Sequence, residues 1–104
     1  MKLRTMTEAE FEQEIVGAPH PVLIDFATPW CAPCRALAPI LSALASERAG
    51  KLRIETVDAE ASLPLSRRFD VRSFPTVIAF SGGREVARAV GLMAKEKLVA
   101  RLKL

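Results

Sequence analysis

The chain has 104 residues, of which 50% are hydrophobic and 26% charged, with a formal net charge of +3. This is enough for one domain with its own core and too little for two, and the composition excludes a disordered or fibrous protein. We therefore expect a single domain over residues 1–104.

The N-terminal segment does not look like an export signal. Lys2 and Arg4 are followed by a series of glutamates before any apolar run long enough for a signal peptide. The longest apolar stretches, PVLIDFA and FPTVIAF, are far shorter than the roughly 20 residues that span a bilayer. We expect a cytoplasmic protein with no membrane contact.

The positive net charge does not indicate a nucleic-acid partner. Basic residues are scattered along the chain, and one modest group lies near the C-terminus: Lys95, Lys97, Arg101 and Lys103. No aromatic side chains lie between them to stack on bases, and such a group is typical of a solvated helix face.

Three elements are predicted in the first third of the chain. A short strand near Lys2 to Thr5 would come first. Thr7 and Glu10 form a T-x-x-E capping box followed by apolar residues at helical spacing, which predicts a helix from about Glu8 to Val16. The run PHPVLIDFA, with Pro21 at the start of its apolar part, predicts a buried strand.

The middle of the chain predicts helix, strand and helix. Apolar residues recur at intervals of three and four from Cys34 to Ala49, and Gly50 is placed to end this helix. Pro39 removes one backbone donor, so we expect the helix to bend there rather than end. KLRIETVDA alternates as a strand does, and Ser62 can cap a short helix over Leu63–Phe69.

The last third predicts a hairpin and a closing helix. PTVIAFSGGREVARAV turns at its two glycines, and AKEKLVARLKL is amphipathic. The order is therefore β-α-β-α-β-α-β-β-α. Helices between successive strands predict parallel pairing, and the hairpin adds an antiparallel edge. We expect an α/β fold in which a central mixed sheet is flanked by helices on both faces.

Both cysteines lie in TPWCAPCRALAPI, where a predicted strand gives way to a helix. The spacing of Cys31 and Cys34 places both on one face of a helical turn, about 5–6 Å apart, which suits a disulfide. The free amides and the positive dipole of the first turn favour a thiolate at Cys31. We expect Cys31 to attack a substrate disulfide and Cys34 to resolve the mixed disulfide.

Two other uses of the cysteine pair have less support. A structural zinc ion needs four ligands, and the chain offers two cysteines and one histidine, His20, so we expect no metal. An inert structural disulfide is unusual in a reducing cytosol and would not explain the residues around the pair.

The residues around the cysteines resemble the thioredoxin family along nearly the whole chain. WCAPCR is preceded by VLIDF and followed by LAPIL, VDAE, FDVRSFPTVIAF, GG and VG, in order and with matching spacing. The resemblance implies the thioredoxin fold and a monomeric protein disulfide reductase without a bound cofactor. It also implies an NADPH-dependent thioredoxin reductase as the source of electrons and disulfide-containing client proteins as the substrates.

The resemblance assigns a role to Asp25, which stands in an apolar strand six residues before Cys31. In similar proteins this aspartate lies beneath the cysteines and exchanges a proton with the resolving thiol. Desolvation would raise its pKa towards the working pH. From the residues alone, an aspartate turned towards the strand end stays possible as the alternative.

The resemblance also implies a substrate groove beside the cysteines. The family's match for Pro75 is cis and faces the disulfide, which leaves the backbone of Phe74 free to pair with an extended substrate segment. The remaining groove positions are Trp30, Ala32, Pro33 and Gly91.

The sequence departs from the family pattern at three positions near the site. Ala32 replaces the usual glycine between the cysteines, and Ala27 stands where a second tryptophan is common. Thr56 stands where bacterial members often carry a lysine, so we expect Asp25 to be harder to ionise. Two alternatives to a reductase stay open: a more oxidising thiol oxidant or isomerase, and a non-catalytic interaction module.

Overall fold

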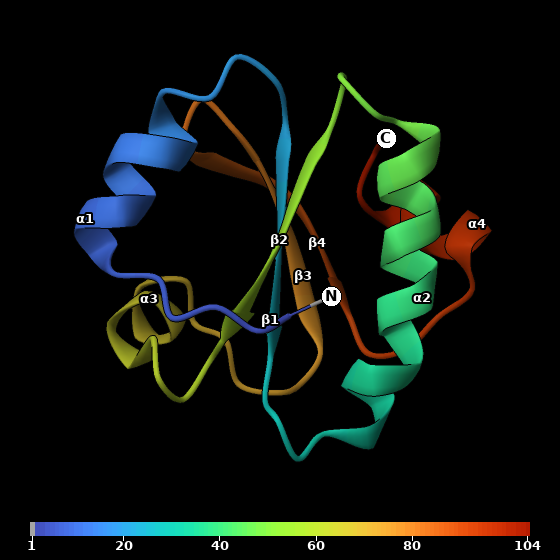
Figure 1. The fold of residues 1–104 in the computed structure, drawn as a ribbon, viewed down its shortest axis with the longest axis horizontal. Helices are drawn as coiled ribbons and strands as arrows, with labels where there is room; N and C mark the ends of the chain where they lie inside the picture. The colour runs from blue at the N-terminus through green and yellow to red at the C-terminus, as the bar shows by residue number, and fades with distance from the viewer. Residues whose placement is uncertain (1) are drawn as a thin grey trace.

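The computed structural model describes residues 2–104 and arranges them around one four-stranded sheet (Figure 1). The helices and strands are α1 Glu8–Phe11, η1 Glu12–Val16, β1 Val22–Ala27, α2 Ala32–Glu47, β2 Arg53–Asp58, α3 Leu63–Arg68, β3 Thr76–Ser81, β4 Arg84–Val90 and α4 Lys95–Arg101. These bounds follow the predicted segments. The predicted first helix is present, but its second half, η1, is wound as a π-helix.

The strand order is β2-β1-β3-β4. β2 lies parallel to β1, whereas β3 is antiparallel to β1 and β4 is antiparallel to β3. The prediction that successive helix-linked strands run parallel is therefore wrong for β3. The six residues of α3 cover about 9 Å, which is too short to return along a six-residue strand of about 20 Å. The chain consequently enters β3 from the end of the sheet at which β2 finishes.

The strand expected near Lys2 to Thr5 is reduced to one parallel bridge between Arg4 and Val57. The Arg4 N–H donates to the Thr56 carbonyl at 3.0 Å, and the Arg4 carbonyl accepts from the Asp58 N–H at 2.9 Å. The chain then leaves the sheet, because the capping box that begins α1 follows almost at once. The observed order therefore starts with a helix.

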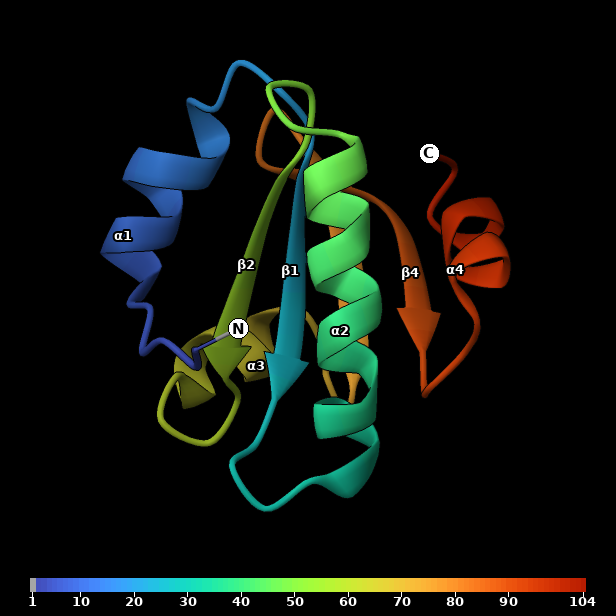
Figure 2. The same cartoon turned by 45° about the vertical axis from the view of Figure 1, so that its right-hand side comes forward.

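Helices cover both faces of the sheet, as predicted (Figures 1 and 2). α1, η1 and α3 pack against one face through Phe11, Ile15 and Leu65, where they meet Ile24 and Phe26 of β1. On the other face, α2 and α4 bury a second cluster: Leu23, Leu37, Leu41, Leu44, Val77, Ala79, Ala89, Leu98 and Leu102. Because side chains alternate along a strand, Asp25 of β1 points to the α2 face, as Leu23 does.

Two details of the helices bear on the predictions. α2 continues through Pro39, so the proline does not end it, as expected. Ser62 is the N-cap residue of α3, but its hydroxyl makes no capping bond. It accepts instead from the Met6 N–H at 2.8 Å, which ties the N-terminal segment to α3. The capping role predicted for the Ser62 side chain is therefore wrong.

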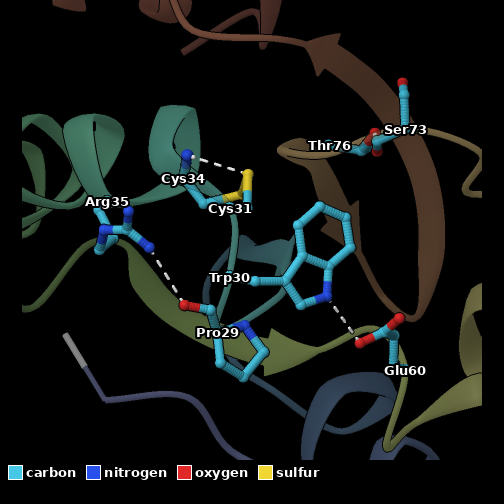
Figure 3. The surroundings of a disulfide bond; sticks show 8 residues. All are labelled: Pro29, Trp30, Cys31, Cys34, Arg35, Glu60, Ser73 and Thr76. Carbon is cyan, nitrogen blue, oxygen red and sulfur yellow. Dashed lines mark hydrogen bonds between the residues drawn. A yellow bond between two sulfur atoms is a disulfide. The ribbon is translucent and has the colours of Figure 1, made fainter.

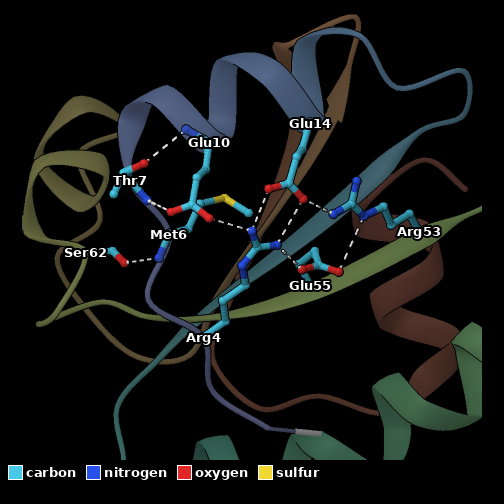
Figure 4. Close-up of polar contacts among 8 residues, drawn as sticks. All are labelled: Arg4, Met6, Thr7, Glu10, Glu14, Arg53, Glu55 and Ser62. Atoms are coloured by element: carbon cyan, nitrogen blue, oxygen red, sulfur yellow. Dashed lines mark hydrogen bonds and ion pairs between the residues drawn. The ribbon is translucent and has the colours of Figure 1, made fainter.

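A cluster of ion pairs holds the N-terminal segment against β2 and the first helix (Figure 4). The Arg4 guanidinium contacts carboxylates of Glu10, Glu14 and Glu55 at 2.5–2.8 Å. Arg53 of β2 shares Glu14 with Arg4, at 2.7 Å. These contacts fix the segment that contains Leu3.

Within residues 2–104, the helices lack the combination of length and apolar character that a membrane span needs.

Candidate active site

Cys31 and Cys34 form a disulfide at the N-terminus of α2, with their Cα atoms 5.3 Å apart (Figure 3). This confirms the proximity expected from their spacing. Cys31 is the N-cap residue of α2, and its Sγ accepts a hydrogen bond from the Cys34 N–H at 3.2 Å. The helix begins here because the chain leaves β1 through a short turn and Pro33 suits the first helical turn.

Residue burial does not distinguish the two cysteines, because Cys31 is 4% exposed and Cys34 is 6% exposed. Their positions on the helix do. The Sγ of Cys31 accepts a hydrogen bond from a backbone N–H of the first turn and lies at the positive end of α2, and both features stabilise a thiolate. The geometry therefore agrees with Cys31 as the attacking sulfur, which remains a proposal.

Asp25 lies in β1, is 2% exposed, and lines a pocket together with Cys34. Burial raises the pKa of the Asp25 carboxyl from an ordinary value of 3.8 to about 7. The carboxyl therefore exchanges its proton near neutral pH, which is what a general acid or base requires.

The pocket beside Asp25 has a volume of about 120 Å³. Thr56 of β2, Thr28 of the turn after β1, and Leu3 of the N-terminal segment also line it. Sequence reasoning found Thr56 and missed Leu3 and Thr28. Leu3 is brought there by long-range packing, which leaves no local signal. Thr28 could have been identified from the sequence, because it lies between a predicted buried strand and the two cysteines.

Two of the expected groove residues are near the disulfide: Phe74 packs against the cysteines, and its ring contacts that of Trp30. The Phe74–Pro75 peptide is cis, as the resemblance implied, and Pro75 is buried. The Pro75 carbonyl accepts a hydrogen bond from the Gly91 N–H at 2.8 Å. Gly91 has φ +94°, a conformation that side chains disfavour, so a glycine suits this position.

Trp30 is the large exposed side chain at the site, with 64% of its surface exposed. Its indole Nε1 donates to Glu60 Oε1 at 3.0 Å, as Figure 3 shows, and its ring lies edge-on to Phe74 with centroids 6.1 Å apart. Ala32 and Pro33 are also exposed, in the first turn of α2. Sequence reasoning missed Glu60, which comes from the segment after β2.

A metal centre has no support in residues 2–104, where no group of three or more His, Cys, Asp or Glu side chains could hold an ion. His20 is exposed in the segment before β1, on a different element from the cysteines.

Comparison with known proteins supports the same interpretation. The family model described as Thioredoxin matches residues 2–104. A thioredoxin of Alicyclobacillus acidocaldarius is 40% identical over 98 residues, which cover 94% of this chain and 92% of that protein. Thioredoxin 1 of Nostoc sp. is 36% identical over 93 residues, or 89% of this chain and 87% of that protein.

A longer relative has a second activity in its name. The bifunctional thioredoxin reductase/thioredoxin of Mycobacterium leprae is 38% identical over 94 residues, which cover 90% of this chain and 20% of that protein. The mixed sheet between two helical layers, the disulfide and these matches agree with one another. The chain therefore belongs to the thioredoxin family, and Cys31 and Cys34 are the redox-active pair of a thiol-disulfide oxidoreductase.

Proposed function

We propose that the protein reduces disulfides of client proteins and is returned to its dithiol form by an NADPH-dependent thioredoxin reductase. The observation that carries this proposal is the buried Asp25, which lines one pocket with Cys34. Such a carboxyl would be costly to bury without a use, and one with a pKa near 7 can serve a thiol that must lose its proton.

The first step forms a mixed disulfide. The Cys31 thiolate attacks one sulfur of the client disulfide, a new sulfur–sulfur bond forms, and the other client sulfur leaves as a thiolate that takes up a proton from solvent. The position of Cys31 at the N-cap of α2 supports this role, because the first-turn amides stabilise its thiolate.

The second step releases the client. The Asp25 carboxylate takes the proton of the Cys34 thiol, and the resulting thiolate attacks the Cys31 sulfur. The Cys31–Cys34 bond forms, and the second client sulfur leaves as a thiolate that is protonated in turn. Two electrons have then passed from the protein to the client, so both client sulfurs end as thiols.

We propose that an extended client segment lies in the groove formed by Trp30, Ala32, Pro33, Phe74, Pro75 and Gly91. The exposed indole of Trp30 and the exposed first turn of α2 supply apolar surface next to the disulfide. A client strand can pair with the backbone beside Pro75, as extended peptides do at sheet edges.

The reductase partner is supported by the relative from Mycobacterium leprae, whose name joins a thioredoxin reductase to a thioredoxin. For this chain we propose a separate reductase and action as a monomer in the cytoplasm, a compartment that keeps thiols reduced.

The equilibrium between dithiol and disulfide forms tests this function. The protein is equilibrated in buffers of defined reduced and oxidised glutathione, and free thiols are counted by alkylation and mass spectrometry. A potential well below that of the cytosolic glutathione pool supports a reductase. A potential at or above the pool would indicate an oxidant or isomerase instead.

Recycling and turnover are tested separately. A mixture of NADPH, a thioredoxin reductase and a disulfide-bonded protein substrate should consume NADPH only when this protein is added. A Cys31→Ser variant that retained full biological activity would instead identify a non-catalytic interaction module.

A further inference from the structure

Two residues that line the pocket beside Cys34 each carry a buried oxygen atom without a hydrogen-bond partner among residues 2–104. These atoms are Oδ1 of Asp25 and Oγ1 of Thr28, and both residues are 2% exposed. Buried polar groups in proteins are almost always hydrogen-bonded to protein or to ordered water, because desolvation without a partner is costly. Two such atoms on residues that line one pocket indicate a shared partner.

The pocket is large enough for that partner to be water. Its volume is about 120 Å³, and one ordered water needs roughly 10–15 Å³ together with two to four polar neighbours. Three residues with side-chain oxygen atoms, Asp25, Thr28 and Thr56, line the pocket together with Cys34. The outer wall includes Pro29 and Arg35, both exposed, so the pocket opens to solvent on that side.

Thr28 is held in place by the turn that also positions the nucleophile. It is the first residue after β1, and its carbonyl accepts the Cys31 N–H at 3.3 Å. The neighbouring Pro29 carbonyl accepts from the Arg35 guanidinium at 3.2 Å, which joins the turn to α2. The backbone of Thr28 is therefore held in place relative to Cys31 and α2.

We propose that Thr28 is a positioning residue for proton transfer: its hydroxyl and the Asp25 carboxyl hold an ordered water through which Asp25 exchanges protons with solvent. This inference rests on the proposed function, in which Asp25 takes the proton of Cys34. The proton passes from the Cys34 sulfur to the carboxylate, then to the water, which gives a proton to bulk solvent. The water changes no other bond, and no electrons move in this step.

A substitution at Thr28 tests this proposal without changing the other polar and charged groups that line the pocket. α2 contributes the Arg35 guanidinium and, after reduction, the Cys34 thiol. β2 contributes the Thr56 hydroxyl, and the N-terminal segment contributes the apolar Leu3. Arg35 is thus the cation that lines this pocket among residues 2–104, and a substitution at Thr28 leaves it unchanged.

The experiment compares Thr28→Val, which keeps the side-chain shape and removes the hydroxyl, with Thr28→Ser, which keeps the hydroxyl. The first readout is the titration of the Asp25 carboxyl in the oxidised protein, followed by carbon-13 NMR. Without the hydroxyl, the carboxylate is less well hydrated. We expect the valine variant to raise the pKa of Asp25, lowering its acid dissociation constant about tenfold, and the serine variant to titrate like the native protein.

The second readout is the pH profile of client release from a preformed mixed disulfide in a single turnover. We expect Thr28→Val to slow release about tenfold near pH 7, in line with a disturbed proton transfer, and Thr28→Ser to stay within about twofold of the native rate. A native titration and native release in Thr28→Val would overturn the inference. Equal changes in both variants would also overturn it, because packing would then be the cause.

Two controls complete the test. If the valine variant does not fold, Thr28→Ala lacks the hydroxyl without adding bulk and gives the same comparison with serine. Asp25→Asn in the release assay separates the two proposals. Native release in Asp25→Asn would refute the proton transfer by Asp25 and this inference together, whereas slow release in Asp25→Asn with native release in Thr28→Val would refute the role of Thr28 alone.

Discussion

Asp25 and Thr56 are register partners on the parallel strands β1 and β2, and both line the pocket beside Cys34. The register partner of Asp25 on β2 therefore carries a hydroxyl rather than a charge. Burial raises the pKa of Asp25 to about 7 in this setting. The identity of the residue at position 56 should consequently control how readily Asp25 ionises.

Thr56→Lys should lower the pKa of Asp25. A lysine ammonium within about 4–6 Å of the carboxyl would favour its charged form. Thr56→Met is the matched control, because it adds length without charge. Carbon-13 NMR titration of the Asp25 carboxyl in the oxidised proteins measures the effect. A native pKa equal to or lower than that of the lysine variant would contradict this account of the pocket.

Asp25→Asn should stabilise the protein at alkaline pH relative to acid pH. The folded pKa, about 7, lies above the ordinary 3.8, so between these values the native state binds the proton that the unfolded state has released. The contribution of Asp25 to the free energy of unfolding of the native protein therefore falls as pH rises from about 4 to about 7. The variant lacks this loss, which amounts to about 4 kcal/mol over the full range.

The measurement is urea unfolding of the oxidised native and variant proteins at pH 4 and pH 8. From pH 4 to pH 8, the free energy of unfolding of Asp25→Asn should rise by several kcal/mol relative to that of the native protein. The other carboxyls contribute equally to both proteins, so their effects cancel in this comparison. A difference that did not change with pH would show that Asp25 ionises as an exposed aspartate does.

Cys31→Ser and Cys34→Ser should fail at different steps. Without Cys31 the nucleophile is missing, so no mixed disulfide should form with a disulfide-bonded peptide. Without Cys34 the mixed disulfide should form and persist, because the resolving thiol is absent. Intact-mass spectrometry of the incubated proteins distinguishes the two results. Accumulation of the adduct in the Cys31 variant would reverse the proposed roles.

Local pattern was enough to predict most elements and the contact between the cysteines. The capping box at Thr7, the apolar spacing of α2 and the glycine turn before β4 each act over a few residues, and the structure confirms all three. The proximity of Cys31 and Cys34 follows from the geometry of one helical turn, so three residues of spacing suffice to predict it.

The errors concern relationships that local pattern does not contain. The direction of β3 depends on how far α3 carries the chain, which the prediction of a crossover helix did not consider. Ser62 was predicted to cap α3 through its side chain, but its hydroxyl accepts a hydrogen bond from the N–H of Met6, 56 residues away. The place of Leu3 in the pocket around Asp25 was missed for the same reason, since Leu3 reaches it through tertiary packing.

Arg4→Met should loosen the N-terminal segment and destabilise the fold. Arg4 contacts Glu10, Glu14 and Glu55 with about a third of its side chain exposed (Figure 4). A half-buried network of this kind exceeds a typical exposed pair, so we expect a loss of roughly 1–2 kcal/mol at pH 7 in urea unfolding. Arg4→Lys, which keeps the charge without the planar fork, should lose less.

The pH dependence of this loss separates charge from packing. Hydrogen bonds from Arg4 and Arg53 lower the pKa of Glu14 to about 2. A lowered pKa contributes stability above the ordinary value of 4.5, and that contribution disappears as pH falls towards 2. The difference between native and Arg4→Met should therefore shrink over this range. A difference that stayed constant would mean that Arg4 acts through the packing of its side chain, and the anchoring of Leu3 beside the Asp25 pocket would not depend on charge.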